Sequence, residues 1–376
     1  MKLRSFAAAS FLLFGHVALG DSVPSVPQPE LPTHTAVASS VDDASVSGTA
    51  SSEESDQAAS LTALQNCEHA RSPRSGACEV TRLNDRPITT ASDIRARVPR
   101  TPHPLFLWRF ETRGSVVYLA GSIHVMKASL FPLPAQLEAA FEHAQRIAVE
   151  VNTDAADPES MRQKFLDYAL LPSGQTLGAL LKPTTLAALS EHLRAQSIPL
   201  ASVGALKPVM LSTQLAVARL SALGYLPQFG LEQHFMGAAG ARPILELETI
   251  DQQLAVLTSP PMSVQDEMLA ETVDQMDTIE PIISAMIVAW LAGDEREFRR
   301  LFDLESGDSP EVQAFMRRLL EDRNVGMADK IAGYLQMPGT TFVLVGAAHL
   351  TGPEGIVALL AARGLKGRRI NSNDTI

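Results

Sequence analysis

Two stretches of the sequence carry the same pattern around a histidine. YLAGSIHV ends an apolar run with Gly121 and places His124 three residues later, and VLVGAAHL does the same with Gly346 and His349. Imidazole side chains bind metal ions and transfer protons near neutral pH. A pattern that occurs twice in one chain therefore indicates one site in which two histidines act together.

Two glutamates end further predicted strands, and another glutamate and an arginine lie near the starts of expected helices. Glu150 ends the apolar run RIAVE, and Glu248 ends RPILELE. Reactive groups of open α/β sheets gather outside the carboxyl ends of the strands, so both are expected beside the histidines. Glu232 and Arg323 each lie near the start of an expected helix; His234, two residues after Glu232, cannot share its helix face. The guanidinium of Arg323 can pair with a carboxylate or bind a developing oxyanion. A salt bridge on the protein surface is the alternative interpretation.

The elements around the two motifs predict an α/β fold. A hairpin over 105–121 leads into the first motif, and a helix over 133–144 and a strand over 146–151 follow it. The second motif precedes a helix over 353–364 and a final strand. Each copy is thus a βαβ unit, which packs as parallel strands with a right-handed crossover. We expect a central mixed, mostly parallel sheet built from both units, with a large, mostly helical insertion between them over about 158–335.

The composition narrows the possible partners. The chain has 376 residues, of which 45% are hydrophobic, and a formal net charge of −11. An acidic surface attracts neither nucleic acid nor anionic membranes, so we expect a peptide or small-molecule substrate and no nucleic acid. The sequence contains no His-Glu-x-x-His, no Gly-x-Ser-x-Gly and no phosphate-binding glycine loop, which argues against the common hydrolase and nucleotide-binding classes.

Residues 1–20 have the features of a secretory signal peptide. They combine a basic start, an apolar stretch and small residues before an expected cleavage after Gly20. An uncleaved membrane anchor is the alternative interpretation. Since no later stretch is long and apolar enough to span a bilayer, we expect a periplasmic or secreted protein with no integral membrane span after cleavage.

The segment that follows is predicted to be unstructured. Residues 21–66 hold seven Asp or Glu and no Lys or Arg, without apolar periodicity, which predicts a disordered acidic tether rich in Ser, Ala and Pro. Residues 67–103 form a transitional segment, and 104–376 the compact domain. In an oxidising compartment Cys67 and Cys78 are expected to form a disulfide, with a two-cysteine metal site as the weaker alternative.

Seven separated motifs together resemble the TraB/GumN family, which includes the Tiki proteases. They are YLAGSIHV, IAVEV, GLEQHF, LELETI, AWLAGD, RNVGMADKI and FVLVGAAHLTGPEGIVALLAARG. The resemblance covers residues 104–372 in order. It implies a metal-dependent, hydrolase-like domain, since Tiki proteins are associated with manganese- or cobalt-dependent peptide cleavage.

The resemblance also assigns residues. Carried over, the critical positions are His124, Glu150 and His349, with Glu232, Glu248 and Arg323 around them. One departure is visible, because this chain has Gly230-Leu231-Glu232 where the family suggests Gly-apolar-Asp. The longer side chain keeps the charge and extends its reach by one methylene.

The leading hypothesis is an exported, peptidase-like metallohydrolase. Its expected catalytic residues are His124, Glu150, His349 and Arg323, and its expected metal ligands are His124, Glu150, Glu232, Glu248 and His349. A divalent metal would polarise a carbonyl and lower the pKa of a bound water, and mixed His and carboxylate ligands suit Mn²⁺, Co²⁺ or Zn²⁺.

Two other hypotheses use the same residues. In the first, no metal is needed: His124 or His349 acts as the general base and a glutamate orients it, as the similar erythromycin-esterase-like folds suggest. In the second, the protein is a non-enzymatic periplasmic protein whose paired histidines hold a metal or haem.

Overall fold

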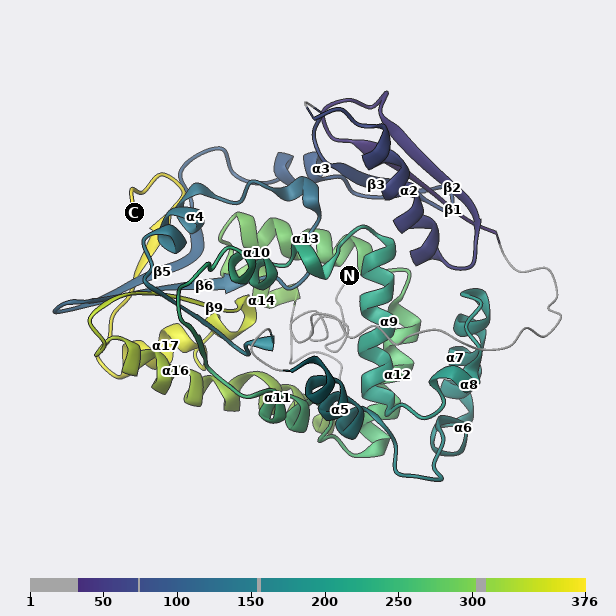
Figure 1. Ribbon diagram of the computed structural model, residues 1–376. Coiled ribbons are helices and arrows are strands. Elements are labelled where there is room, and N and C mark those ends of the chain that lie inside the picture. The colour runs from purple at the N-terminus through teal and green to yellow at the C-terminus, as the bar shows by residue number, and fades with distance from the viewer. Residues whose placement is uncertain (1–32, 74, 154–156, 302–308) are drawn as a thin grey trace.

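Figure 1 shows a mixed sheet flanked by helices, and a smaller sheet built from the N-terminal part of the chain. The computed structural model describes residues 33–73, 75–153, 157–301 and 309–376. The predicted signal peptide, residues 1–20, and the first part of the expected tether lie outside these ranges.

The main sheet has six strands in the order β10-β5-β6-β9-β7-β8. Its strands are β5 (Pro104–Thr112), β6 (Ser115–Ser122), β7 (Arg146–Val149), β8 (Ile244–Glu246), β9 (Gly339–Gly346) and β10 (Arg368–Asn371). The expected β5–β6 hairpin is antiparallel, β10 pairs antiparallel with β5, and the remaining pairs are parallel. The prediction of a mixed, mostly parallel sheet is therefore confirmed.

The two βαβ units are interleaved in this sheet. The first runs through β6, α4 (Ala135–Glu142) and β7, and the second through β9, α17 (Ile356–Ala362) and β10. Because β9 lies between β6 and β7, the strands that precede the two histidine motifs are direct neighbours. Ser122 lies opposite Gly346 in the parallel register, so both motifs leave the sheet at the same edge.

The insertion between β7 and β9 is mostly helical, as predicted, with the short β8 inside it. Its α-helices are α5 (Pro158–Ala169), α6 (Leu177–Leu180), α7 (Pro183–Ala195), α8 (Leu200–Val203), α9 (Pro208–Ala222), α10 (Leu231–Gly237), α11 (Ile250–Leu257), α12 (Met262–Gln275), α13 (Ile279–Leu291), α14 (Glu295–Leu301), α15 (Pro310–Arg317) and α16 (Arg323–Tyr334). Proline occupies the first turn of α5, α7, α9 and α15, where its missing N–H removes no helical hydrogen bond.

Short helical turns connect several of these elements. The 3₁₀ turns are η1 (Ala128–Leu130), η3 (Pro227–Phe229) and η5 (Ala347–Leu350), and η4 (Arg318–Asp322) is a π-helical segment that joins α15 to α16. No helix in the described ranges combines the length and the apolar content needed to cross a membrane.

Aromatic side chains attach helices to both faces of the main sheet. On one face, Phe141 of α4 and Phe235 of α10 pack against Phe342 of β9. On the other, Phe298 of α14 packs against Phe106 of β5, with ring centroids 5.1 Å apart. The apolar core thus holds the sheet between helical layers and leaves its carboxyl edge for polar groups.

Residues 34–73 and 75–96 form a folded unit, which we call the N-terminal module. Its antiparallel sheet has the order β2-β1-β3-β4 and consists of β1 (His34–Ser40), β2 (Ser47–Glu53), β3 (Cys78–Leu83) and β4 (Arg86–Pro87). The helices α2 (Asp56–Ala70) and α3 (Ala91–Ala96) complete it. The predicted disulfide is confirmed: Cys67 of α2 is bonded to Cys78 of β3, with their Cα atoms 6.1 Å apart.

The prediction of a disordered tether over 21–66 is wrong from His34 onward, and the transitional segment over 67–103 contains regular elements of the same module. The physical reason lies in small side chains. Ala36 and Ala38 of β1 are buried, and a Cβ atom on Gly48 of β2 would come within 2.2 Å of the backbone of α2. Helix and sheet therefore approach closely, so a segment with few large apolar residues still packs.

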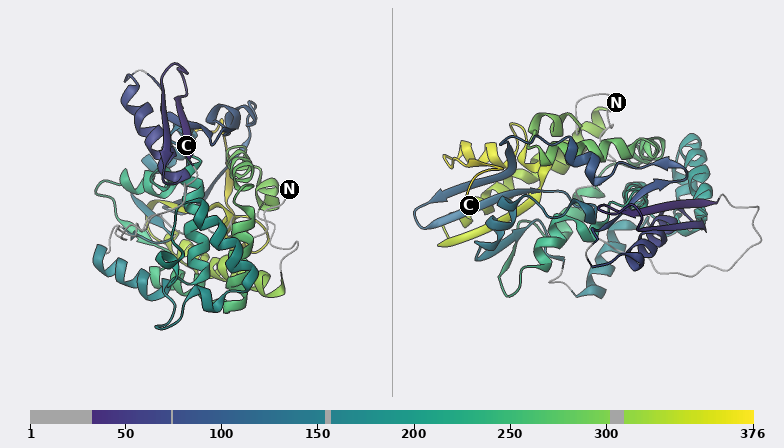
Figure 2. Two further views of the ribbon diagram at one scale, coloured as in Figure 1. Left: turned by 90° about the vertical axis from the view of Figure 1, so that its right-hand side faces the viewer. Right: turned by 90° about the horizontal axis from the view of Figure 1, so that it is seen from above.

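The module is attached to the helical insertion (Figure 2). Asp56, at the start of α2, is buried and accepts a hydrogen bond from Arg219 of α9 at 3.0 Å. Ser60 donates to the carbonyl of Ala222 at 2.6 Å. The acidic residues that suggested disorder thus include one that pairs with a cation across this contact.

The close approach at Gly48 gives a stability prediction. Gly48→Ala places a methyl group against backbone atoms of Ala63, Asn66 and Cys67 and should lower the free energy of unfolding by roughly 1–3 kcal/mol, measured by urea denaturation. Gly178→Ala is the control, since a Cβ there meets no atom within 4 Å. Equal stability of the two variants would contradict the packing described for α2.

Candidate functional site

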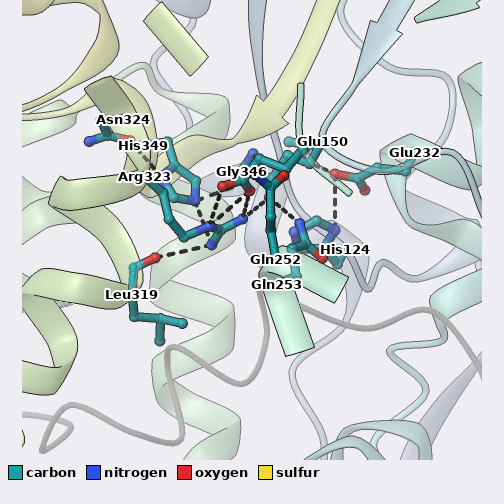
Figure 3. A network of polar contacts seen from close by, with 12 residues as sticks. His124, Glu150, Glu232, Gln252, Gln253, Leu319, Arg323, Asn324, Gly346 and His349 are labelled. Carbon is teal, nitrogen blue, oxygen red and sulfur yellow. Dashed lines mark hydrogen bonds and ion pairs between the residues drawn. The ribbon is translucent and has the colours of Figure 1, made fainter. Parts of the chain in front are cut away.

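Side chains that follow four strands converge at the carboxyl edge of the sheet, and Figure 3 shows those of His124, Glu150 and His349. His124 and His349 follow the neighbouring strands β6 and β9, Glu150 follows β7 directly, and Glu248 lies two residues after β8. Strand pairing continues past β8, because the backbone N–H of Glu248 donates to the carbonyl of Glu150 at 2.8 Å. The topology therefore assembles residues that lie more than two hundred positions apart in the sequence.

Arg323 lies at the centre of this group and is only 6% exposed. Its Nη2 donates to Glu150 Oε2 at 2.8 Å, and its Nε donates to Glu248 Oε2 at 2.9 Å. Its Nη1 donates to the carbonyl of Leu319 at 3.0 Å and, over a longer 3.4 Å, to Nε2 of His349. Every nitrogen of the guanidinium thus has an acceptor, as a buried cation requires.

The π-helical segment η4 explains how Arg323 reaches that position. A π turn widens the helix by one residue, which leaves a backbone carbonyl displaced from the regular ladder. In η4 the carbonyl of Leu319 accepts from the side chain of Arg323, four residues later. The same segment therefore directs the guanidinium toward the sheet edge and satisfies one of its donors.

The pKa values of the two glutamates that share Arg323 shift in opposite directions. Burial alone would raise the pKa of Glu150, but the charges of His349, which is protonated at such low pH, and of Arg323 and His124 outweigh it and hold this pKa at about 2. Glu150 Oε1 also accepts from the backbone N–H of Gly346 at 2.7 Å, and Oε2 accepts from Gln253 at 3.0 Å. Burial raises the pKa of Glu248 although Arg323 opposes it. Glu150 therefore keeps its charge to a lower pH than Glu248 does.

His349 belongs to a chain of hydrogen bonds that determines its tautomer. Asn324 donates through Nδ2 to the carbonyl of Glu354 at 2.8 Å, so its Oδ1 is free to accept from Nδ1–H of His349, at 2.7 Å. Nε2 of His349 then accepts from Arg323. Burial lowers the pKa of His349 to about 4, with Arg323 lowering it further and Glu150 opposing. His349 is thus a neutral and weakly basic imidazole.

His124 has a carboxylate partner instead. Its Nδ1 lies 2.9 Å from Oε1 of Glu232, which also accepts from the hydroxyl of Ser122. Burial opposes protonation of His124, but Glu232 outweighs it and raises the pKa of this imidazole. The side chains of His124 and Glu232 are only 13% and 16% exposed. Nε2 of His124 and Oε2 of Glu232 are buried and have no hydrogen-bond partner among the described residues.

Gly230 and Leu231 bring Glu232 to this histidine. A Cβ on residue 230 would lie 2.2 Å from the carbonyl oxygen of His124, so only glycine permits this approach. The N–H of Leu231 donates to the carbonyl of Ile123 at 3.1 Å. The longer glutamate at position 232, expected as a departure from the family, is thus the residue that contacts Nδ1.

The structure brings all six predicted site residues to the same edge of the sheet, as the His124–Glu232 pair and the cluster around Arg323, and leaves His234 outside both. His234 pairs with Glu138 of α4, at 3.0 Å, as expected if only one of Glu232 and His234 faces the site. An open cavity of about 630 Å³ reaches the cluster at Glu248 and Arg323 and is walled by α11 and α16.

Sequence reasoning missed three contacting side chains. Asn324 follows Arg323 in the motif RNVGMADKI and was given no role, and Gln253 and Ser122 were not singled out. The signal for Ser122 is its place inside the first motif, between Gly121 and His124. Gln253 carries no comparable signal, because its approach to Glu150 depends on the start of α11.

The fit of a divalent metal depends on which donor atoms remain free. The two Nε2 atoms suit a metal in type, and both histidines have the Nδ1 partners that metal ligands have. Both oxygens of Glu150, however, already accept hydrogen bonds. Among the described residues no group of three or more His, Cys, Asp or Glu side chains is arranged to hold an ion. The arrangement as it stands does not match a preformed metal site, and the expected metal stays a prediction.

Fold and site together define an α/β domain with histidines, glutamates and an arginine at the carboxyl edge of the parallel strands in a mixed sheet. The sequence matches the TraB/PrgY/gumN family over residues 106–369, and the chain belongs to this family, as the seven motifs predicted. No curated protein and no solved structure matches the chain.

The low pKa of His349 gives a pH prediction. Below pH ~6.5 the unfolded chain binds a proton at this residue, whereas the folded protein does so only near pH 4. The free energy of unfolding should therefore fall by up to about 3 kcal/mol between these values from this group alone. Urea denaturation at several pH values should show a smaller fall in His349→Gln, and the unchanged wild-type fall in a control, His143→Gln, whose side chain is exposed. Equal slopes in all three proteins would contradict the assignment.

Proposed function

We propose that the domain is a hydrolase that cleaves an acyl bond, with His124 as the general base and Glu232 as the residue that orients it. The observation that carries this proposal is the buried Nε2 of His124, which has no partner among the described residues and lies opposite a hydrogen-bonded Nδ1. A carboxylate on Nδ1 selects the tautomer whose Nε2 accepts a proton, and it stabilises the imidazolium that forms.

The reaction then proceeds in two proton transfers. Nε2 of His124 takes a proton from water as the water oxygen adds to the acyl carbon, and it returns the proton to the leaving amine or alkoxide as the old bond breaks. The 3.4 Å contact between Arg323 and His349 is the weakest donation of the guanidinium. An oxyanion would replace His349 there at the smallest cost.

His349 is a poorer candidate for the base. Its Nε2 accepts from Arg323, its Nδ1 partner is an amide, and its pKa of about 4 makes it a weak proton acceptor. We assign it the role of holding Arg323, and Glu150 and Glu248 the role of neutralising the guanidinium.

The proposal is tested with fluorogenic peptides and p-nitrophenyl esters as substrates. His124→Gln should lower kcat/KM by about 10²–10⁴-fold, whereas His234→Gln, which removes a histidine outside the site, should leave it unchanged. The reaction needs neutral His124, so activity should rise with pH through a pKa that Glu232 raises. Glu232→Gln should lower the maximal rate and move this rise to lower pH.

The same assay distinguishes the alternatives. Full activity of His124→Gln would contradict the assigned base. Activity lost with EDTA and restored by Mn²⁺, Co²⁺ or Zn²⁺ would establish the metal-dependent hydrolase instead. A stoichiometric metal or haem, found by elemental and absorption analysis without hydrolysis of any substrate, would favour the binding protein.

We further propose that the protein is exported and acts on peptides outside the cytoplasm. The disulfide between Cys67 and Cys78 supports an oxidising compartment. Intact mass of protein from the exported fraction should correspond to a chain that starts at Asp21 and should increase by about two hydrogens on reduction. An unprocessed N-terminus, or free thiols before reduction, would contradict this location.

A further inference from the structure

We infer that the N-terminal module positions the His124–Glu232 pair, and that the buried Lys127 and Glu79 are the positioning residues through which it acts. The kinetic consequence rests on the proposed function, whereas the structural consequence rests on contacts alone. The module lies before the region that matches the family, 106–369, so a contribution to this site comes from the additional part of the chain.

Lys127 attaches the segment after His124 to the module. It follows the histidine by three residues, and its side chain is 1% exposed. Its Nζ donates to the carbonyl of Thr89 at 2.6 Å and lies 3.9 Å from the carboxylate of Glu79. The ammonium also lies 4.9 Å from the ring centroid of Tyr225. A charged group thus anchors this segment to the module.

Glu79 provides a second attachment to the same segment. Its Oε2 accepts from the hydroxyl of Ser129 at 2.9 Å and from the N–H of Ala91 at 2.8 Å. Glu79 follows Cys78 on β3, and the disulfide to Cys67 joins that strand to α2. The carboxylate is therefore held by a covalently connected part of the module.

A buried lysine at position 127 is explained better by the need to position the backbone after His124 than by a gain in the stability of the folded protein. Burying an ammonium costs several kcal/mol unless its donors are satisfied, and an apolar side chain of similar volume avoids that cost. Burial lowers the pKa of Lys127 to about 8, against the opposing effect of Glu79. The ammonium differs from a methionine side chain in that its hydrogen bonds are directional. These bonds fix the position of the backbone around Lys127.

Residues 123–129 also bind the segment that precedes Glu232, the partner of His124. Met126 and Leu226 form an antiparallel bridge, with N–O distances of 3.3 and 2.8 Å. Leu231 donates to the carbonyl of Ile123. A displacement of residues 123–129 would therefore disturb both His124 and the segment that holds Glu232, and with them the 2.9 Å contact between the two side chains.

The kinetic test compares two variants that both change the module's packing. Lys127→Met should lower kcat at least tenfold and leave KM within about twofold, because small misplacement of a catalytic group lowers the rate of the chemical step. Gly48→Ala perturbs the module where β2 meets α2, at backbone atoms of Ala63, Asn66 and Cys67 that take part in none of the contacts given above for Lys127 and Glu79, and it should retain kcat at temperatures below its Tm. If Lys127→Met does not fold, Glu79→Gln takes its place in this comparison.

A spectroscopic test needs no activity. Long-range ¹H–¹⁵N correlation of EDTA-treated wild-type protein should show His124 with its proton on Nδ1, hydrogen-bonded to Glu232. In Lys127→Met or Glu79→Gln that resonance should broaden or move toward the mixed tautomers of a free histidine, and Gly48→Ala should keep it. This result decides the positioning role even if the proposed hydrolysis is absent.

Two outcomes would overturn the inference. One is a folded Lys127→Met protein whose His124 resonance is that of wild type. The other is an equal change of that resonance in Gly48→Ala, since the module would then act only through general stability.

Discussion

A guanidinium buried between two carboxylates is the interaction on which this site depends. Arg323 directly follows the π-helical segment η4 and begins α16. Its guanidinium donates hydrogen bonds to Glu150 and Glu248, which follow β7 and β8. Because a buried cation is tolerated only when its donors are satisfied, the ends of these strands and this helix constrain one another. His349 and Leu319 accept the remaining donors. The carboxyl edge of the sheet is thereby held in one arrangement.

The repeated motif has produced two unlike histidines. Both follow a glycine on neighbouring parallel strands, yet His124 has a carboxylate on Nδ1 and His349 has an amide. The carboxylate raises the pKa of the first imidazole, whereas burial beside Arg323 lowers the pKa of the second. The same motif therefore places both histidines at the same edge of the sheet. The groups around each ring then determine its pKa and hence its ability to accept a proton.

The sheet and its edge were predictable because they depend on local patterns. Apolar runs that end in Gly121, Glu150 or Gly346 indicate buried strands, and parallel strands place such ends together. Asn324 and Gln253 were not predictable, since their roles depend on where helices begin. The module over 34–66 was missed because its packing uses small residues such as Ala38 and Gly48. Composition measures how much apolar surface a segment has and not how closely two backbones approach.

The interleaving of β9 between β6 and β7 has a consequence for the order of folding. Until residues 339–346 have joined, the β5–β6 hairpin and the β7–β8 pair have no strand in common, and each presents an unpaired edge. Contacts of such large sequence separation form slowly, because a long loop must close before they contribute stability. An incomplete chain would thus expose two strand edges that readily pair with other chains. The joining of β9 would therefore unite the two parts of the sheet and close both of these edges in a single step.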